Sequence, residues 1–252
     1  MPIRPTGNPE ILGMQGLNLF HYSYSNCAMR IRLFLEEKGI PWNDHFVDLR
    51  KQENLTEAYF AIHPQGLVPA IVDDGVIVYE SADILKYLEE KYPEPSLIPE
   101  DAEAKAELEK ILEFTRTGHL PIIKTWAYGR NNKPTKTPES MAKFEELQKD
   151  TCLVDFHRET LNEGGIPEEK ILVAEKVLKD MFTDLDGRLA YNKWILGDTM
   201  TLANIAWIPQ YALFQRNDFP FDPYPNFMAY VARWQKRSAY IKAIGEHMPG
   251  SM

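Results

Sequence analysis

The sequence over residues 67–81 reads Leu67-Val68-Pro69-Ala70-Ile71-Val72-Asp73-Asp74-Gly75-Val76-Ile77-Val78-Tyr79-Glu80-Ser81, and it decides the fold. Two runs rich in β-branched residues flank Asp74-Gly75, and glycine accepts the positive φ that a tight turn demands. This pattern predicts an antiparallel hairpin. Glu80-Ser81 ends the hairpin and opens a helix to about Tyr92, with the Ser81 hydroxyl available as its cap.

Upstream of the hairpin, strand and helix patterns alternate. Residues 17–20 alternate apolar and polar side chains, as in a short strand, and residues 25–38 change to a helical period. A weaker strand signal covers residues 42–49, and a polar segment with helical character reaches His63. The predicted order for residues 17–92 is therefore β-α-β-α-β-β-α.

Downstream of residue 92, the pattern changes to helix. Three prolines within residues 92–99 forbid a continuous helix and predict a linker at residues 93–100. Helices are expected at about 101–124, 140–163, 167–192, 201–216 and 225–245. Thr201 is expected to cap the fourth of them, with Asn204 three residues on and with Met200 and Ile205 placed as a hydrophobic staple.

The predicted fold class is α/β plus all-α. Residues 17–92 form the sheet-containing domain and residues 101–252 an all-helical domain, while residues 1–16 are an N-terminal extension without an assigned role. No apolar run approaches the roughly 18 residues that span a bilayer, and the N-terminus lacks a secretory core. We therefore expect no membrane association and a cytoplasmic setting.

Charge and metal-ligating residues exclude several functions. The net charge of -9 and the absence of a Lys/Arg stripe argue against nucleic acid as a partner. The two cysteines, Cys27 and Cys152, are far apart, and the six histidines show no ligand spacing. We expect no metal.

Four short motifs, in order and at family spacing, resemble the glutathione transferase superfamily over about residues 17–245. They are the Ser25 helix start, the segment His63-Pro64-Gln65-Gly66-Leu67-Val68-Pro69, the pair Glu80-Ser81, and Trp194-Ile195-Leu196-Gly197 with Thr201-Leu202-Ala203-Asn204-Ile205. The resemblance implies a thioredoxin-like N-terminal domain, an all-helical C-terminal domain, and glutathione as co-substrate. His63 replaces the usual Asn, Asn204 the usual Asp, and Leu67 a Gln or Lys that meets glutathione in many members. The segment Arg50–Asn54 is our candidate source of that missing contact, with Asn54 as its best-placed member.

The start of the first long helix offers the chemistry that such an enzyme needs. A free thiol has a pKa of about 8.5, and lowering it to about 6.5 requires on the order of 2.7 kcal/mol. A helix N-terminus and a hydroxyl or amide donor can together supply this energy. The segment Ser25-Asn26-Cys27-Ala28-Met29-Arg30-Ile31-Arg32 resembles the start of zeta-like serine-type enzymes, so Ser25, with Asn26 beside it, inherits the thiolate-stabilising role.

Other readings of this segment stay open. Ser25 taken alone is an ordinary helix cap. Tyr22 competes with it, because tyrosine-type members place a phenol at the end of the first strand, and Tyr24 is a weaker competitor. Cys27 is a candidate covalent nucleophile, two residues past the serine position.

The resemblance also assigns the glutathione-binding residues. A cis Val68-Pro69 bond would aim the Val68 backbone outward as a pairing edge for the cysteinyl part. The Glu80 carboxylate would meet the γ-glutamyl ammonium, and the Ser81 hydroxyl with the helix N-terminus would meet its carboxylate. The alternative for Glu80 is a plain surface acid.

The second substrate is expected to be a hydrophobic aromatic molecule in the helical half. Candidate pocket residues are His119, Trp126, Tyr128, Trp207, Tyr211 and Phe214. The long stretch between Arg130 and Lys170 resembles the insertion of bacterial β-etherases of the superfamily, which cleave β-aryl ethers of lignin-derived ketones. General conjugation or dehalogenation and a non-enzymatic binding module are the alternatives. The resemblance implies a dimer, either a homodimer or a heterodimer.

Overall fold

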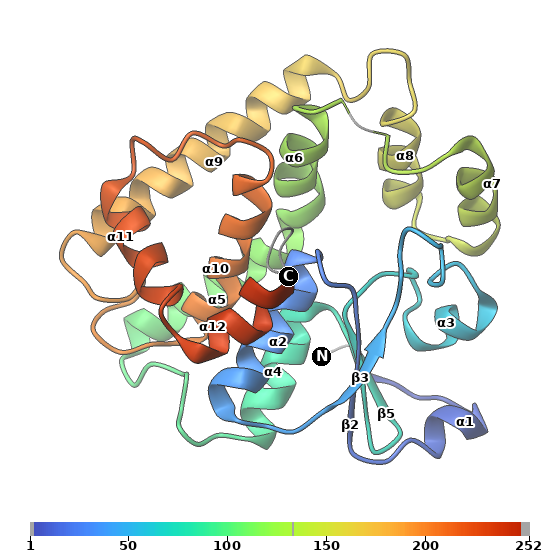
Figure 1. The fold of residues 1–252 in the computed structure, drawn as a ribbon, viewed down its shortest axis with the longest axis horizontal. Coiled ribbons are helices and arrows are strands. Elements are labelled where there is room, and N and C mark those ends of the chain that lie inside the picture. Colours follow the sequence, from blue (N-terminus) through green and yellow to red (C-terminus); the bar gives the residue numbers. More distant parts are fainter. Residues whose placement is uncertain (1–2, 133, 248–252) are drawn as a thin grey trace.

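A mixed sheet with helices on both faces packs against a larger helical domain (Figure 1). The computed structural model describes residues 3–132 and 134–247. The sheet has five strands in the order β1-β5-β4-β2-β3, and only the β2–β3 pair is parallel. The strands are β1 Ile3–Arg4, β2 Leu17–His21, β3 Asn43–Phe46, β4 Ala70–Asp73 and β5 Val76–Tyr79. This mixed sheet with its helices is the expected thioredoxin-like arrangement.

The hairpin predicted from residues 67–81 is present. Asp73 pairs with Val76 across the two-residue turn Asp74-Gly75, whose φ angles are 47° and 82°. Both angles are positive, as a type I′ turn requires, and this turn has the right-handed twist of the flanking strands. The turn therefore sets the register between β4 and β5.

The N-terminal segment adds to the sheet, which the sequence pattern does not predict. Ile3 and Arg4 pair with Val78 and Ile77 at the edge of β5, and helix α1 (Pro9–Leu12) places Ile11 in the core, 2% exposed. A strand of two residues is too short to show alternation. The expected order β-α-β-α-β-β-α is found from Leu17 onward, behind this added strand and helix.

Helices bury both faces of the sheet, so apolar and polar side chains alternate only weakly along its strands. Helices α2 (Asn26–Lys38) and α4 (Ser81–Lys91) cover one face, and α1 with α3 (Glu57–Ile62) covers the other. All five residues of β2 are buried. Since α2 and α4 also contact the helical domain, their first turns lie at the junction of the two halves.

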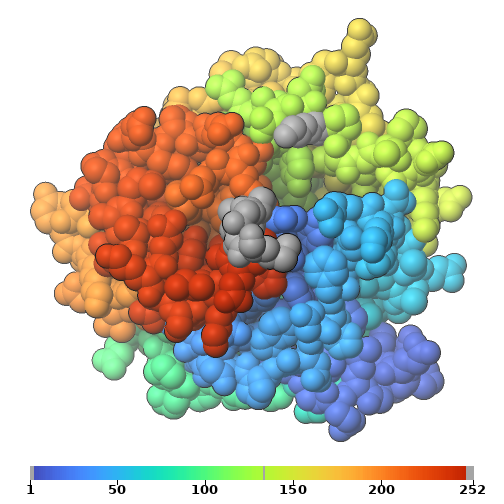
Figure 2. All heavy atoms as spheres, viewed as in Figure 1, coloured from blue at the N-terminus to red at the C-terminus, as the bar shows by residue number. Residues whose placement is uncertain are grey.

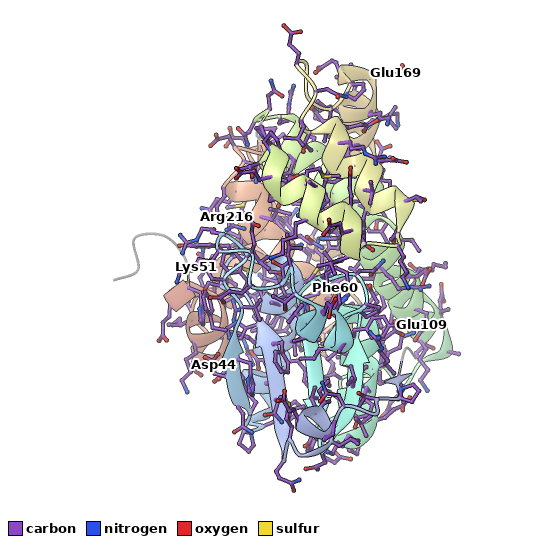
Figure 3. All side chains as sticks on the ribbon, turned by 90° about the vertical axis from the view of Figure 1, so that its right-hand side faces the viewer. Asp44, Lys51, Phe60, Glu109, Glu169 and Arg216 are labelled. Atoms are coloured by element: carbon purple, nitrogen blue, oxygen red, sulfur yellow. The ribbon has the colours of Figure 1, made fainter. Side chains whose placement is uncertain are left out.

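The helical domain contains more and shorter helices than expected. Its elements are α5 Ala102–Thr117, the π-helix η1 His119–Lys124, α6 Thr125–Gly129, α7 Pro138–Leu147, α8 Thr151–Glu159, α9 Glu168–Leu189, α10 Leu202–Gln215, α11 Pro225–Trp234, α12 Ser238–Ala243 and the 3-10 turn η2 Gly245–His247. Among the described residues, no helix is long and apolar enough to cross a bilayer. In side view the sheet lies below these helices (Figure 3).

Three of the expected helices are interrupted, two of them at local hydrogen bonds and one at a contact with α2. The helix expected at 140–163 divides because Asp150 caps a new helix by accepting from the backbone of Cys152 and Leu153. The helix expected at 225–245 stops before Arg237, whose guanidinium binds Glu37 of α2. The helix expected at 101–124 becomes a π-helix after Gly118, whose carbonyl accepts from two successive N–H groups.

The Thr201–Asn204 motif ties the start of α10 to the preceding loop and to the linker, but not through the expected cap. The Thr201 hydroxyl accepts from the Asn204 side chain at 3.2 Å rather than from the helix backbone. Asn204 Oδ1 accepts the N–H of buried Ile195, and the Leu202 N–H donates to the linker carbonyl of Leu97. The amide of Asn204 thus connects α10 with the preceding loop.

Replacing Asn204 by alanine is expected to lower the free energy of unfolding by about 1–3 kcal/mol, because the N–H of Ile195 loses its buried acceptor. Urea denaturation measures the effect. Asn204→Asp is the control, since it keeps an acceptor oxygen and places negative charge in the first turn of α10. An equal loss in both variants would contradict this role.

Candidate functional site

A cavity of about 990 Å³ lies between the sheet domain and the helical domain. Its walls come from the β2–α2 loop, the segment before β4, the start of α4, η1, α6, α8 and the end of α10. The space-filling view shows the sheet domain (blue) meeting the C-terminal helices (orange to red) and the segments of α6 to α8 (green to yellow) around this region (Figure 2).

The cavity brings together every catalytic and glutathione-binding residue expected from the sequence. Its lining contains Ser25, Asn26, Asn54, Val68, Pro69, Glu80 and Ser81, and also the competitors Tyr22 and Cys27. These residues come from four separate segments of the chain. The sheet topology unites them, because the β2–α2 loop, the start of β4 and the end of β5 lie at one edge of the sheet.

Ser25 is the N-cap of α2 and lies in the cavity wall. Its Oγ accepts the backbone N–H of Ala28 at 3.2 Å, and its side chain is partly exposed. Because that bond uses the oxygen as an acceptor, the hydroxyl proton remains available to donate. The cap role and the role toward a sulfur anion are therefore compatible in one side chain.

Asn26 and Cys27 point to neighbours in the helical domain. The Asn26 amide donates to Gln210 of α10 at 2.5 Å, and the Asn26 side chain is buried. Cys27 Sγ lies 3.5 Å from Nε2 of His119 and 3.7 Å from the guanidinium of Arg30. Asn26 thus fixes the first turn of α2 against α10.

The segment before β4 presents its backbone to the cavity. The Val68-Pro69 bond is cis, as the resemblance implies. The backbone N–H and C=O of Val68 make no hydrogen bond with the residues that the structure describes. The neighbouring carbonyls are held by side chains: Tyr59 donates to Leu67 at 2.7 Å, and Asn54 donates to Gly66 at 2.7 Å. The side-chain amide of Asn54, which was expected to contact glutathione, therefore donates to the loop backbone instead.

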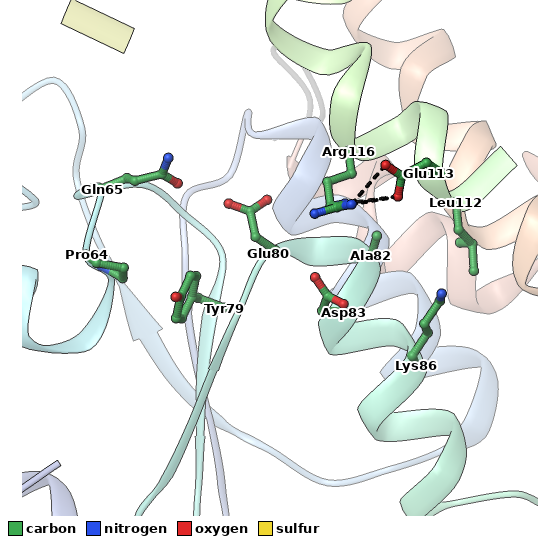
Figure 4. Close-up of a pocket in the computed structure, with 10 residues that line it drawn as sticks. All are labelled: Pro64, Gln65, Tyr79, Glu80, Ala82, Asp83, Lys86, Leu112, Glu113 and Arg116. Atoms are coloured by element: carbon green, nitrogen blue, oxygen red, sulfur yellow. Dashed lines mark hydrogen bonds and ion pairs between the residues drawn. The ribbon is translucent and has the colours of Figure 1, made fainter. Parts of the chain in front are cut away.

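Glu80 and Ser81 stand at the start of α4. Glu80 has a φ of 67°, and Ser81 accepts from the buried Arg30 at 2.9 Å. Burial, reinforced by Asp83, raises the pKa of Glu80. Glu80 also borders a second hollow of about 680 Å³ between α4 and α5, where it lies between Gln65 and Arg116 (Figure 4).

Tyr22 lies in the cavity wall as well, but its surroundings do not favour ionisation. Its ring contacts Tyr24 and Phe46 and is 9% exposed. Burial raises the pKa of Tyr22, with Arg50 acting in the opposite direction. The phenol is therefore a neutral donor at physiological pH.

The six aromatic candidates divide between the cavity and the core. His119 and Tyr128 line the cavity. Trp126, Trp207, Tyr211 and Phe214 do not, since each is at most 4% exposed and belongs to the helical core. Trp126 lies in α6 and the other three in α10, a helix that is buried on nearly all sides, so the expectation that they form the pocket was wrong for these four.

Three cations in the cavity wall were missed from the sequence: Lys124 at the end of η1, Lys136 before α7, and Arg216 after α10. Arg216 donates to the Tyr24 carbonyl at 3.0 Å and thereby joins the two domains, at the position labelled in Figure 3. None of the three stands in a motif, so nothing in the sequence distinguishes them from surface cations. Among the described residues, no group of three His, Cys, Asp or Glu side chains could hold a metal ion.

The cavity of this thioredoxin-like domain combines a helix N-terminus, an unpaired backbone edge and a carboxylate, which are groups that can hold a small thiol-containing peptide. Comparison with known families agrees. Residues 19–96 match the glutathione S-transferase N-terminal domain and residues 156–237 match the C-terminal domain, which together cover more than half of the chain. The chain belongs to the glutathione S-transferase superfamily, whose members bind glutathione.

Individual relatives are distant but cover nearly the whole chain. Glutathione S-transferase Z2 of Arabidopsis thaliana is 28% identical over 92% of each chain. Maleylpyruvate isomerase of Ralstonia sp is 27% identical over 93% of this chain and all of its own. The structure of β-etherase LigF from Sphingobium sp. strain SYK-6 superposes with a TM-score of 0.75 at 22% identity, covering 91% of this chain and 99% of its own, and this shows a common fold.

Proposed function

We propose that this protein is an enzyme that holds glutathione in the cavity and uses Ser25 to keep its thiol as a thiolate, ready to attack an electrophilic aromatic substrate. The observation that carries the proposal is the Ser25 side chain, whose oxygen caps α2 while its proton is free to donate into the cavity. A donor to a charged sulfur contributes about 1.5–3 kcal/mol, and the helix N-terminus about 0.3–1 kcal/mol. Their sum accounts for the roughly two-unit fall in pKa that the chemistry needs.

The other cavity residues fit the remaining parts of glutathione. The unpaired N–H and C=O of Val68 can pair with the cysteinyl backbone, as one strand does with another. The Glu80 carboxylate faces the γ-glutamyl ammonium, and the first turn of α4 with Ser81 meets its carboxylate. Asn26 and Asn54 act as positioning residues, since their amides are bonded to Gln210 and Gly66.

For the second substrate we propose a β-aryl ether ketone. The thiolate would displace an aryloxide from the carbon next to the ketone, a step that needs positioning and stabilisation of the departing oxygen. The segment between Arg130 and Lys170, which carries α7 and α8, supplies the cavity wall on this side through Phe144 and His157. A cavity of about 990 Å³ is large enough for glutathione beside a second molecule.

A second candidate is isomerisation of an unsaturated dicarboxylic acid. The cationic wall with Lys124 and Lys136 favours it, because carboxylates would find complementary charge there. The relative named maleylpyruvate isomerase supports it as well.

The test of the enzyme proposal is a mass-spectrometric screen with glutathione present. The panel contains β-aryl ether ketones, maleyl-type acids, haloalkanes and a generic arylating agent. A glutathione thioether with a released phenol supports ether cleavage, and a trans acid without net consumption of glutathione supports isomerisation. If no substrate turns over and the protein is not retained on immobilised glutathione, the chain is a binding module of the fold instead. Native mass spectrometry of the same sample tests the dimer that we propose for the protein.

Glu80→Gln is expected to weaken glutathione binding about tenfold, because a carboxylate paired with an ammonium is a stronger contact than an amide. The same change is expected to raise the free energy of unfolding at pH 7. Burial raises the pKa of Glu80, so its ionised form destabilises the folded protein above the usual Glu pKa of about 4.3. As pH falls through the raised pKa, wild type and variant should converge in stability.

Calorimetric binding and thermal unfolding between pH 4 and pH 8 measure both effects. Glu90→Gln is the matched control, since Glu90 is an exposed carboxylate of α4 that lines neither hollow. Equal glutathione affinity in wild type and Glu80→Gln would remove Glu80 from the binding site.

A further inference from the structure

The cavity carries positive charge in a protein of net charge -9. Among its described lining residues, Glu80 is the one carboxylate, and the cations are Arg50, Lys124, Lys136 and Arg216. In the site proposed above, glutathione pairs its cysteinyl backbone with Val68 and its γ-glutamyl carboxylate with Ser81 and the start of α4, at the sheet side. The cations of the helical side are therefore left for a different ligand.

Among the four lining cations, Lys124 is the one without a direct hydrogen bond, ion pair or ring contact to the residues that the structure describes. Arg50 pairs with Asp48, Arg216 donates to two carbonyls, and Lys136 lies 4.1 Å from the ring centre of Phe144. Lys124 is partly buried and has no hydrogen bond or ion pair with the residues that the structure describes. It is the last residue of η1, so the π-helical turn places its side chain in the cavity wall.

The groups around Lys124 add to the imbalance. Burial lowers the pKa of Lys124, with Cys27 and Glu80 acting in the opposite direction. Lys124 in turn helps to lower the pKa values of Lys136 and His119, both already lowered by burial. Each of these groups would gain from an anion placed among them, because a negative charge offsets both the repulsion and the lost hydration.

We propose that Lys124, supported by Lys136, binds an oxyanion of the second substrate. This inference rests on the glutathione-dependent function proposed above and defines the substrate class for the same cavity. The oxyanion has two sources. It is either a carboxylate that the substrate carries, or the aryloxide oxygen that leaves during ether cleavage.

When the oxyanion is the leaving aryloxide, the thiolate, the ether carbon and the Lys124 ammonium account for every bond and proton in the cleavage step. A carbon–sulfur bond forms as the carbon–oxygen bond breaks, and the electron pair of that bond goes to the aryl oxygen. The Lys124 ammonium stabilises the resulting aryloxide and can donate a proton to it. No oxidant or reductant enters the step.

The first arm of the experiment measures binding of 4-phenoxybenzoate and of its neutral carboxamide to the full-length protein by calorimetry, with and without glutathione. The variants are Lys124→Met, Lys124→Arg and, as a matched control on an exposed part of α5, Lys105→Met. A carboxylate site predicts that Lys124→Met weakens the acid at least about tenfold and the amide less than about twofold, and that Lys124→Arg restores the acid. Lys105→Met should match wild type.

The second arm measures turnover of two α-aryloxyketones that release 4-nitrophenolate and unsubstituted phenolate. An aryloxide site predicts that Lys124→Met slows the ketone with the more basic phenolate by at least about tenfold more than the other, because that oxygen carries more charge as it leaves. A response in the first arm assigns a carried carboxylate, and a response in the second alone assigns the leaving oxygen.

Three results would overturn the proposal. Lys124→Met could leave both arms unchanged, weaken acid and amide alike, or weaken glutathione itself while sparing the acid. If the wild-type protein does not bind glutathione, the proposed function fails. The oxyanion site is still tested in that case, because binding of the acid and of the amide is also compared without glutathione. Thermal unfolding of each variant identifies a folding defect. If Lys124→Met has such a defect, the comparison of acid and amide binding in Lys124→Arg with wild type tests the proposal instead.

Discussion

Replacing Ser25 by alanine is expected to lower kcat/KM by about 10- to 100-fold, which corresponds to the 1.5–3 kcal/mol that a hydroxyl donor gives a charged sulfur. The loss should appear mainly in kcat below neutral pH, where fewer glutathione thiols remain ionised. Helix α2 should persist, because its packing against α10 and α12 holds it independently of the first-turn cap.

Tyr22→Phe is the matched control, since Tyr22 lines the same cavity and keeps its packing with Tyr24 and Phe46 when only the hydroxyl is removed. We expect it to change kcat/KM less than about threefold. A large loss in Tyr22→Phe with little change in Ser25→Ala would move the thiolate-stabilising role to the phenol. Ser25→Thr keeps the hydroxyl and should retain more activity than Ser25→Ala.

Phe182→Ala is expected to lower the free energy of unfolding by about 3–5 kcal/mol. Phe182 of α9 is fully buried at the centre of the aromatic core, in contact with the rings of Trp207, Phe214, Phe219, Phe221, Tyr224 and Phe227. Because these rings come from α10, α11 and the loop between them, the space left by the missing Phe182 ring cannot be filled without moving several elements. Urea denaturation followed by tryptophan fluorescence measures the change.

Val173→Ala on the same helix is the comparison, since Val173 is 57% exposed. We expect it to change stability by less than about 0.5 kcal/mol. A loss below about 1 kcal/mol in Phe182→Ala would mean that the helical core repacks around the missing ring.

Much of the sheet domain could be predicted because its signals are local. The Asp74-Gly75 turn identifies the hairpin, and the helix starts at Ser25 and Ser81 follow strand ends directly. All seven expected site residues then meet in one cavity, since the topology places these strand and helix ends at the same edge.

Other features depend on contacts between distant segments and leave no local pattern. Strand β1 has two residues, too few to alternate, and exists because β5 offers a free edge. The break before α8 has a local cause instead, the Asp150 cap, but it falls within a stretch whose pattern is that of a continuous helix. Lys124 resembles any surface lysine in the sequence, and only the π-helical turn and the fold place it in the cavity.

The central claim is that Ser25 holds glutathione as a thiolate, and the most direct measurement is the pH titration of thiolate ultraviolet absorbance for glutathione bound to wild type and to Ser25→Ala. We expect the pKa of the bound thiol to be about two units below the free value of about 8.5 in wild type, and to return most of the way toward that value in the variant. A bound thiol that titrates at the same lowered pKa in both proteins would contradict the claim.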